Sequence, residues 1–245
     1  MGIKERQERD REAVRRAILD AARELFVNEG YQNVSIRKIA ERIEYSPAAI
    51  YGYFPSKDDI FFALAEEGFR LLGDGLENPA CADRLTAGAP LERVRSMFRR
   101  FYEFSREHPQ YFALMFVDRS VPRISREYER FAFAREMRAR LIAQIDACVH
   151  AGIFPATVEP TAACRLITMG LLGVAVMRLS DRLVGTDNAD QLAADVLNVM
   201  LAGLQAGATL TSTAVECPLD EQAVASAIAS ANSPVALAKA NRQAS

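Results

Sequence analysis

Three short helical segments, each with its own start signal, lie in residues 31–62 and leave this part of the chain few ways to fold. Ser35 and Ser46 each precede a short run with helical apolar spacing, and serine is a preferred N-cap because its hydroxyl accepts a bond from a free backbone N–H. Pro47 suits the first helical position, which needs no N–H. Ser56 opens the third segment, with an acidic residue three positions later, as in a capping box. Two such helices joined by about three residues indicate a helix-turn-helix.

The second of these helices has the composition of a DNA-reading helix. Small residues at its N-terminal end can pass the rim of the major groove and contact thymine methyls. Hydroxyls and cations near helix starts can hold phosphates, which the free N–H groups there also favour. The alternative is a three-helix corner of an all-α core, which this polar pattern disfavours. We expect base contacts from Pro47, Ala48 and Ala49 and phosphate contacts from Arg37, Tyr51, Tyr53 and Lys57.

The stretch SIRKIAERIEYSPAAIYGYFPSKDDIF resembles the DNA-binding segment of the TetR family of bacterial transcriptional regulators. That family has a Thr- or Ser-capped helix, a turn, and an aliphatic-Tyr-x-aromatic-Phe run followed by Lys. The resemblance covers residues 12–62, and the remainder matches as a helical domain of suitable length. It implies backbone contacts from Ser35 and Arg37, base contacts from residues 47–49, and phosphate contacts from Tyr51, Tyr53 and Lys57.

Two residues depart from the family pattern. The family usually has glycine in the turn where this chain has Glu44. Glutamate is strained if φ is positive there, which predicts a rearranged turn. Gly52 stands where a larger polar or aromatic residue is common, which predicts one DNA contact fewer. A glycine in so short a helix also costs about 1 kcal/mol relative to alanine.

The residues before the helix-turn-helix divide into a charged lead and one helix. Residues 1–12 carry mixed charges and little to bury, so we expect a frayed helix or a disordered arm. Its arginines either touch the DNA backbone or form a solvated charge run, and the second interpretation is favoured for Arg6, Arg9 and Arg11. A helix is predicted from Glu12 to Asn28, where glycine follows as a stop.

The rest of the chain predicts further helices and no strand, because no segment alternates with period two for long. The resulting fold class is all-α, with a DNA-binding domain at 1–62, a helical ligand-binding and dimerisation domain at 63–210 and a small-residue tail at 211–245. The third short helix is expected to continue to about residue 72 and to join the two domains. We expect a loop at 74–90, helices at 91–107, 109–118, 123–151, 160–184 and 188–208, and one possible short helix at 220–231.

Aromatic and methionine side chains are concentrated in residues 98–133. Most of them individually suit a packed core, but as a group they suit an adaptable apolar cavity, which the family resemblance also implies. The effector would then be a small apolar or aromatic molecule. The expected pocket residues are Phe98, Phe101, Tyr102, Phe112, Met115, Phe116, Phe133, Met137, Met169 and Leu172.

The last two strong helices are apolar on nearly every side and contain glycines that let backbones come close. One interpretation is a buried helix inside a monomer. The favoured one is a four-helix dimer interface, because a two-fold operator requires a two-fold protein. The expected interface residues are Leu166, Gly170, Gly173, Met177, Leu192, Val196, Val199, Met200 and Gly203.

Several classes of function find no support in the sequence. There is no phosphate-binding glycine loop after a strand, no H-E-x-x-H and no nucleophile elbow, so we expect no enzyme, cofactor or metal. His108 and His150 stand alone, and four scattered cysteines indicate free thiols in a reducing cytoplasm. The 12-residue apolar run from Leu166 to Met177 is too short to cross a membrane. The alternatives kept open are a helical carrier or enzyme, and a regulator that responds to a protein partner.

Overall fold

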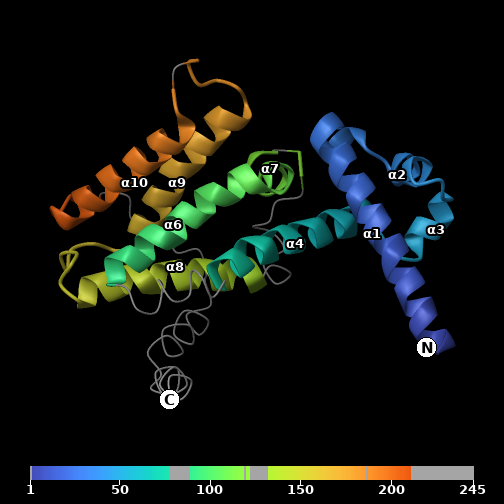
Figure 1. Cartoon of the computed structure of the whole chain (residues 1–245), viewed down its shortest axis with the longest axis horizontal. Coiled ribbons are helices and arrows are strands. Elements are labelled where there is room, and N and C mark those ends of the chain that lie inside the picture. The colour runs from blue at the N-terminus through green and yellow to red at the C-terminus, as the bar shows by residue number, and fades with distance from the viewer. Residues whose placement is uncertain (1, 78–88, 119, 122–131, 186, 211–245) are drawn as a thin grey trace. The chain divides into compact units, whose positions relative to one another are not determined.

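The computed structural model describes residues 2–77, 89–118, 120–121, 132–185 and 187–210, and every regular element in these ranges is a helix (Figure 1). The all-α fold class predicted from the sequence is confirmed. The chain forms two compact units. The first comprises residues 1–71 and 104–131, and the second comprises residues 72–103 and 132–245.

The first unit holds the N-terminal helices and one later segment of the chain. Its elements are α1 (Ile3–Glu29), the 3-10 turn η1 (Tyr31–Asn33), α2 (Ile36–Arg42), α3 (Pro47–Tyr51), most of α4 (Lys57–Glu77), α7 (Pro109–Phe112) and the π-helical turn η2 (Ala113–Val117). The last residues of α4 and most of α6 (Pro90–Glu107) belong to the second unit, so the chain passes from one unit to the other within these two helices.

The three serine start signals are all formed. Ser35 Oγ accepts from the backbone N–H of Lys38 at 3.2 Å, and Ser46 Oγ accepts from that of Ala49 at 3.2 Å. Ser56 Oγ accepts from the backbone N–H of Asp59 at 3.1 Å and donates to Asp59 Oδ2 at 2.6 Å. A serine cap contributes about 1 kcal/mol, so these bonds set where α2, α3 and α4 begin.

A single apolar core holds the short helices of the first unit in place. α1 packs against α2, and α2 packs against α3. Large side chains that are almost fully buried line this core, and they come from α1, α2, α3 and α4: Ile18, Phe26, Ile39, Ile50, Ile60, Phe61 and Leu64. α3 is only five residues long. Because so short a helix is not stable alone, its position depends on this packing.

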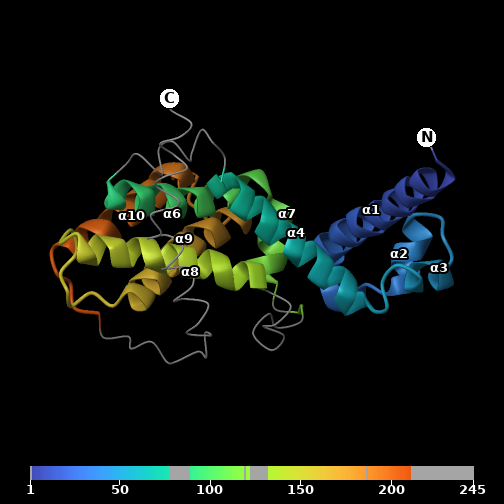
Figure 2. The ribbon, with the colours of Figure 1, turned by 90° about the horizontal axis from the view of Figure 1, so that it is seen from below.

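The second unit contains the last residues of α4, most of α6, α8 (Ala132–His150), α9 (Pro160–Leu179) and α10 (Ala189–Gln205). α9 packs against both α8 and α10 (Figure 2). Its N-terminus is capped by Glu159, whose carboxylate accepts from two backbone N–H groups. Asn188 caps α10 in the same way.

Several helix boundaries differ from the sequence-based expectation. α1 begins at Ile3, so the charged lead is part of that helix. α4 continues to Glu77 into the expected loop. α9 ends at Leu179 because Asp181 has a left-handed φ of 52°, which ends the helical bonding. The expected segments 122–131 and 211–245 lie outside the described residues.

α9 is longer than the apolar run read from the sequence. It has 20 residues and a mean hydropathy of 1.6 in its most apolar window, so by length and composition alone it could cross a membrane. The length argument made from the sequence is therefore wrong. α9 packs against α8 and α10, but only 39% of that window is buried, and Leu166, Met169 and Met177 remain exposed.

Candidate nucleic-acid interface

The outward face of α3 is the candidate reading surface. Ile50 is completely buried, and it anchors the helix to the core of the first unit. Pro47 and Ala48 are exposed, Ala49 is half-buried, and Tyr51 is 56% exposed. The small residues and the tyrosine expected to contact DNA therefore lie on the uncovered side of a helix that is fixed from the other side.

The turn between α2 and α3 keeps a regular geometry in spite of its glutamate. Glu44 has a left-handed φ of 59°. Its backbone N–H donates to Glu41 O at 3.3 Å, and the N–H of Tyr45 donates to Ala40 O at 2.9 Å. This pair of bonds is the Schellman motif, in which glycine usually holds the left-handed position. The prediction of a rearranged turn is wrong: the turn is formed with glutamate in the strained position.

Replacing Glu44 with glycine is expected to raise the free energy of unfolding by up to about 1 kcal/mol, because glycine adopts a positive φ without the clash of a Cβ. Glu44→Ala keeps the Cβ and serves as the control. Urea denaturation monitored by circular dichroism measures both variants. Equal stability of the Gly and Ala variants would show that φ at this position carries no strain.

The residues expected to hold phosphates differ in exposure and in the contacts that they already make. Arg37 is exposed, and its Nε donates to Glu41 at 2.8 Å within α2. An exposed pair of this kind is weak, so the guanidinium can exchange its partner for a phosphate. Ser35 uses its hydroxyl as the cap of α2. Tyr53 is half-buried, and the guanidinium of Arg11 lies 5.9 Å from its ring centroid.

Lys57 is engaged inside the first unit. Its Nζ donates to Tyr31 O at 2.8 Å and to Val34 O at 2.9 Å, and it lies 4.1 Å from the centroid of the Tyr31 ring. The Tyr31 hydroxyl in turn donates to Asp58, and burial together with this bond raises the pKa of Tyr31. Lys57 therefore joins the start of α4 to η1, a structural role that the sequence pattern did not predict.

Replacing Lys57 with methionine is expected to lower the free energy of unfolding by about 1–3 kcal/mol, because two carbonyls of buried residues lose their charged donor. Methionine keeps the apolar stem, so the change isolates the ammonium. Thermal and urea denaturation measure the loss. Lys38→Met, at a half-buried lysine that pairs with Glu29, is the comparison. A Lys57 variant as stable as the wild type would show that these two bonds do not stabilise the first unit.

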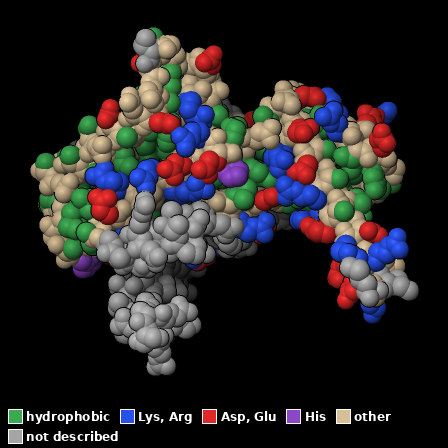
Figure 3. Space-filling view, viewed as in Figure 1, with side chains coloured by type: hydrophobic (Ala, Val, Ile, Leu, Met, Phe, Trp, Pro, Cys, Tyr) green, Lys and Arg blue, Asp and Glu red, His purple; other side chains and the backbone are tan. Residues whose placement is uncertain are grey.

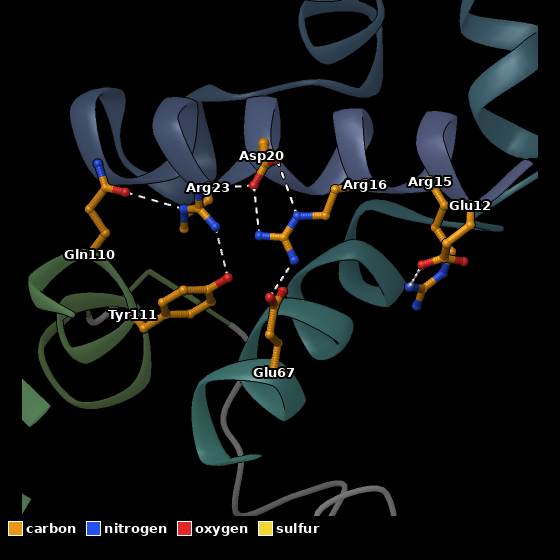
Figure 4. Close-up of polar contacts among 8 residues, drawn as sticks. All are labelled: Glu12, Arg15, Arg16, Asp20, Arg23, Glu67, Gln110 and Tyr111. Atoms are coloured by element: carbon orange, nitrogen blue, oxygen red, sulfur yellow. Dashed lines mark hydrogen bonds and ion pairs between the residues drawn. The ribbon is translucent and has the colours of Figure 1, made fainter. Parts of the chain in front are cut away.

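A polar network ties α1 to two other helices of the first unit (Figure 4). Arg16 pairs with both Glu67 of α4 and Asp20, and these carboxylates raise the pKa of its guanidinium. Arg23 donates to the Tyr111 hydroxyl at 2.7 Å in α7 and lies 2.9 Å from Asp20. α1 supplies part of the core beneath α2 and α3. A change in α4 or α7 can therefore reach the reading surface through these contacts.

The expected pocket residues fall into both compact units. In the first unit, Phe112 and Met115 are buried and Phe116 is half-buried, with its ring 4.9 Å from that of Phe112. Gly68 of α4 lets this cluster approach, since a Cβ there would overlap Met115 Sδ and come within 3.2 Å of Tyr111. The sequence did not single out this glycine.

In the second unit, Phe98, Phe101 and Tyr102 are buried, and Met137 and Leu172 are half-buried. The Tyr102 hydroxyl donates to Asp190 at 3.0 Å, so it secures the start of α10. Met169 is 55% exposed on the surface of α9, which places it outside any lining formed by buried residues. The side chain of Phe133 lies outside the described residues.

The expected interface residues divide into an internal contact and an exposed surface. A Cβ on Gly170 would overlap Met200 and would come within 3.0 Å of Val196, so these three residues pack α9 against α10 within one subunit. Large apolar side chains remain exposed on the same two helices, and glycines lie along the same surface. This apolar surface comprises Leu166, Met169, Gly173 and Met177 of α9 and Leu192, Val199 and Gly203 of α10.

The titratable residues in the described part of the chain offer no reactive site. Cys148 and Cys164 are buried free thiols, and burial raises the pKa of each to about 11. His108 packs against Phe104, and His150 lies 3.3 Å from Asp146. No cluster of metal-ligating side chains occurs among the residues that the structure describes.

A helical chain with a capped helix-turn-helix and an exposed reading helix belongs to the class of helix-turn-helix DNA-binding proteins. Residues 18–64 match the family model for bacterial regulatory proteins of the tetR family. Residues 94–204 match the model for the tetracyclin repressor-like C-terminal domain. The chain belongs to the TetR family.

Named relatives agree with this assignment. The chain is 46% identical over 55 residues to the transcriptional repressor Rv1474c of Mycobacterium tuberculosis, covering 22% of this chain and 29% of the relative. It is 30% identical over 135 residues to the transcriptional regulator BetI of Rhizobium meliloti, covering 54% and 64%. The chain thus spans less than two thirds of the length of these relatives. Both relatives are named as transcriptional regulators.

A solved structure shows the same fold. The TetR family regulator PfmR of Thermus thermophilus superposes with a TM-score of 0.61 at 23% identity, covering 76% of this chain and 98% of that one. Similarity at this level of identity concerns the fold alone.

Proposed function

We propose that the chain is a DNA-binding transcriptional regulator that represses its target as a homodimer on a two-fold operator. The observation that carries the proposal is the exposed N-terminal end of α3, fixed from beneath by the buried Ile50. Ala48 reaches base edges in the major groove, and Tyr51 and Arg37 hold the phosphates beside it. The names of the relatives, repressor and regulator, support the same activity.

A second copy of the chain covers the apolar surface of α9 and α10. Its residues recur at spacings of three and four on α9 and of seven and four on α10, so they lie on one face of each helix. Val199 is 71% exposed in the single subunit, and Met169 is 55% exposed. Exposed apolar stripes of this kind mark association surfaces. A two-fold pairing of them gives a four-helix interface and places two copies of α3 on two half-sites.

The regulator responds to a small apolar or aromatic molecule. The aromatic and methionine content of α6, α7 and α8 supports this proposal, since such side chains suit an apolar ligand. A thermal-shift screen with apolar aromatic compounds tests it. A regulator that answers instead to a protein partner would show no compound-dependent shift and would release DNA only when that partner is added.

Ligand binding acts on DNA through α4. A ligand that favours a displaced α4 also displaces α1, because Glu67 of α4 holds Arg16 and the aromatic cluster packs over Gly68. To lower operator occupancy tenfold, the ligand must bind the displaced state about 1.4 kcal/mol better than the DNA-bound state.

Gel-shift and footprinting with the region upstream of the protein's own gene test the DNA-binding function. The expected result is a protected site with two half-sites, at a protein concentration that leaves a scrambled duplex of equal length free. Equal binding of both duplexes would show DNA binding without sequence preference, and binding of neither would contradict the DNA-binding function.

A further inference from the structure

α1 extends well beyond the part of the helix that packs. It begins at Ile3, whereas the family model begins to match at residue 18. Residues 4–13 are all exposed, so these turns bury almost nothing in their own subunit. A helix that adds no core contact needs another reason for its length and charge. Figure 3 shows Lys and Arg side chains, with Asp and Glu among them, around these turns.

Two cation–π contacts place α1 beside the residues that follow the reading helix. The guanidinium carbon of Arg11 lies 5.9 Å from the centroid of the Tyr53 ring, and that of Arg15 lies 5.3 Å from the Phe54 ring. Tyr53 and Phe54 follow Gly52, the C-cap of α3. α1 therefore passes this segment at Arg11 and Arg15, and its first turns extend beyond it (Figure 1).

The helical period places one more cation on this side. Lys4 precedes Arg11 by seven residues and Arg15 by eleven, so the three share one stripe of α1. Glu8 lies on the same stripe and Glu12 at its edge, where it pairs with Arg15 at 3.7 Å.

The other charges near the N-terminus face elsewhere or are engaged. Glu5 accepts from the backbone N–H of Gly2 at 3.0 Å and thereby caps the helix. Arg6 is exposed on the opposite side of α1 from Lys4.

We propose that Lys4 and Arg11 form a second DNA contact, to the backbone phosphates that flank the half-site read by α3. The inference rests on the proposed function. The guanidinium of Arg11 covers one face of Tyr53 and keeps its N–H groups accessible, so both can approach the same phosphates. The rise of 1.5 Å per residue carries Lys4 about 16 Å beyond Arg15 along the helix. The partner of Lys4 and Arg11 is the phosphate backbone, because cations bind phosphates without regard to base sequence.

The test compares Arg11→Ala with Arg6→Ala in fluorescence anisotropy at several salt concentrations. Both variants remove one exposed arginine from the same helix, so they match in charge and in helix propensity. We expect Arg11→Ala to weaken binding about 3- to 10-fold near 0.1 M salt and to lower the salt slope by about 1 per subunit, equally on operator and scrambled DNA. Arg6→Ala should change affinity less than 2-fold. Glu8→Gln, which removes a negative charge from the stripe, should strengthen binding.

Each outcome decides the inference. Equal behaviour of Arg11→Ala and Arg6→Ala overturns it, as does a Glu8→Gln variant that binds more weakly. Arg11→Lys keeps the charge and is expected to restore most of the salt slope, which separates a phosphate contact from a loss of packing on Tyr53. A wild type that binds no DNA defeats the proposed function itself, whereas a binding wild type with an unaffected Arg11→Ala variant defeats only this second contact.

Discussion

Replacing Val199 with glutamate is expected to convert a dimer into a monomer and to lower operator affinity at least about 100-fold. Val199 is 71% exposed in the single subunit, so the change leaves the fold of that subunit intact. In the dimer the new carboxylate would be buried against an apolar partner surface, where an unpaired charge is strongly unfavourable. A monomer places one reading helix on the operator and loses the gain from binding two half-sites together.

Analytical ultracentrifugation measures the mass of the Val199→Glu variant, and anisotropy measures its affinity. The matched control is Ala194→Glu, which adds the same charge to an exposed position five residues away and about 140° around α10. The control should remain a dimer with unchanged affinity. A dimeric Val199→Glu variant would place the subunit interface elsewhere.

Replacing Phe26 with alanine is expected to lower the free energy of unfolding by about 3–5 kcal/mol, because a large aromatic side chain is removed from a packed core. Phe26 is 1% exposed, and its ring centroid lies 5.0 Å from that of Tyr31. Lys57 donates to the backbone carbonyl of Tyr31 and lies over its ring. The variant therefore destabilises the core that holds α2 and α3. We expect it to lose DNA binding at temperatures where the wild type still binds.

Urea denaturation followed by circular dichroism measures this loss. Phe26→Leu keeps most of the apolar volume and should cost clearly less. An alanine variant within about 1 kcal/mol of the wild type would mean that the core around Phe26 is not packed as described.

The sequence predicted the starts of α2, α3 and α4 well because each start depends on residues that are close in the sequence. Ser35, Ser46 and Ser56 each bond within three residues, so the sequence alone contains both partners. The start of α1 was missed because its charged turns have no apolar period, although Glu and Arg are good helix formers. The left-handed φ of Asp181, which ends α9, has no comparable signal in the sequence.

The contacts that Lys57 and Gly170 make with residues distant in the sequence could not be predicted from local patterns. Lys57 was expected to hold a phosphate, but its partners are carbonyls more than twenty residues earlier in the chain. Gly170 was expected in a subunit interface, and the residues that it accommodates lie on the next helix of the same subunit. In both cases the residue type and its spacing were recognised, and the partner was supplied by the tertiary fold.

Selection of bound sequences from a random duplex pool tests most directly whether α3 reads DNA. We predict that the wild type enriches an inverted repeat whose half-sites are separated by whole turns of the duplex. We also predict that Ala48→Asn changes the preferred base at one position in each half-site, because asparagine pairs with adenine where a methyl group contacted thymine. A pool with no enriched sequence, or an Ala48→Asn variant that enriches the wild-type repeat unchanged, would contradict DNA reading by α3.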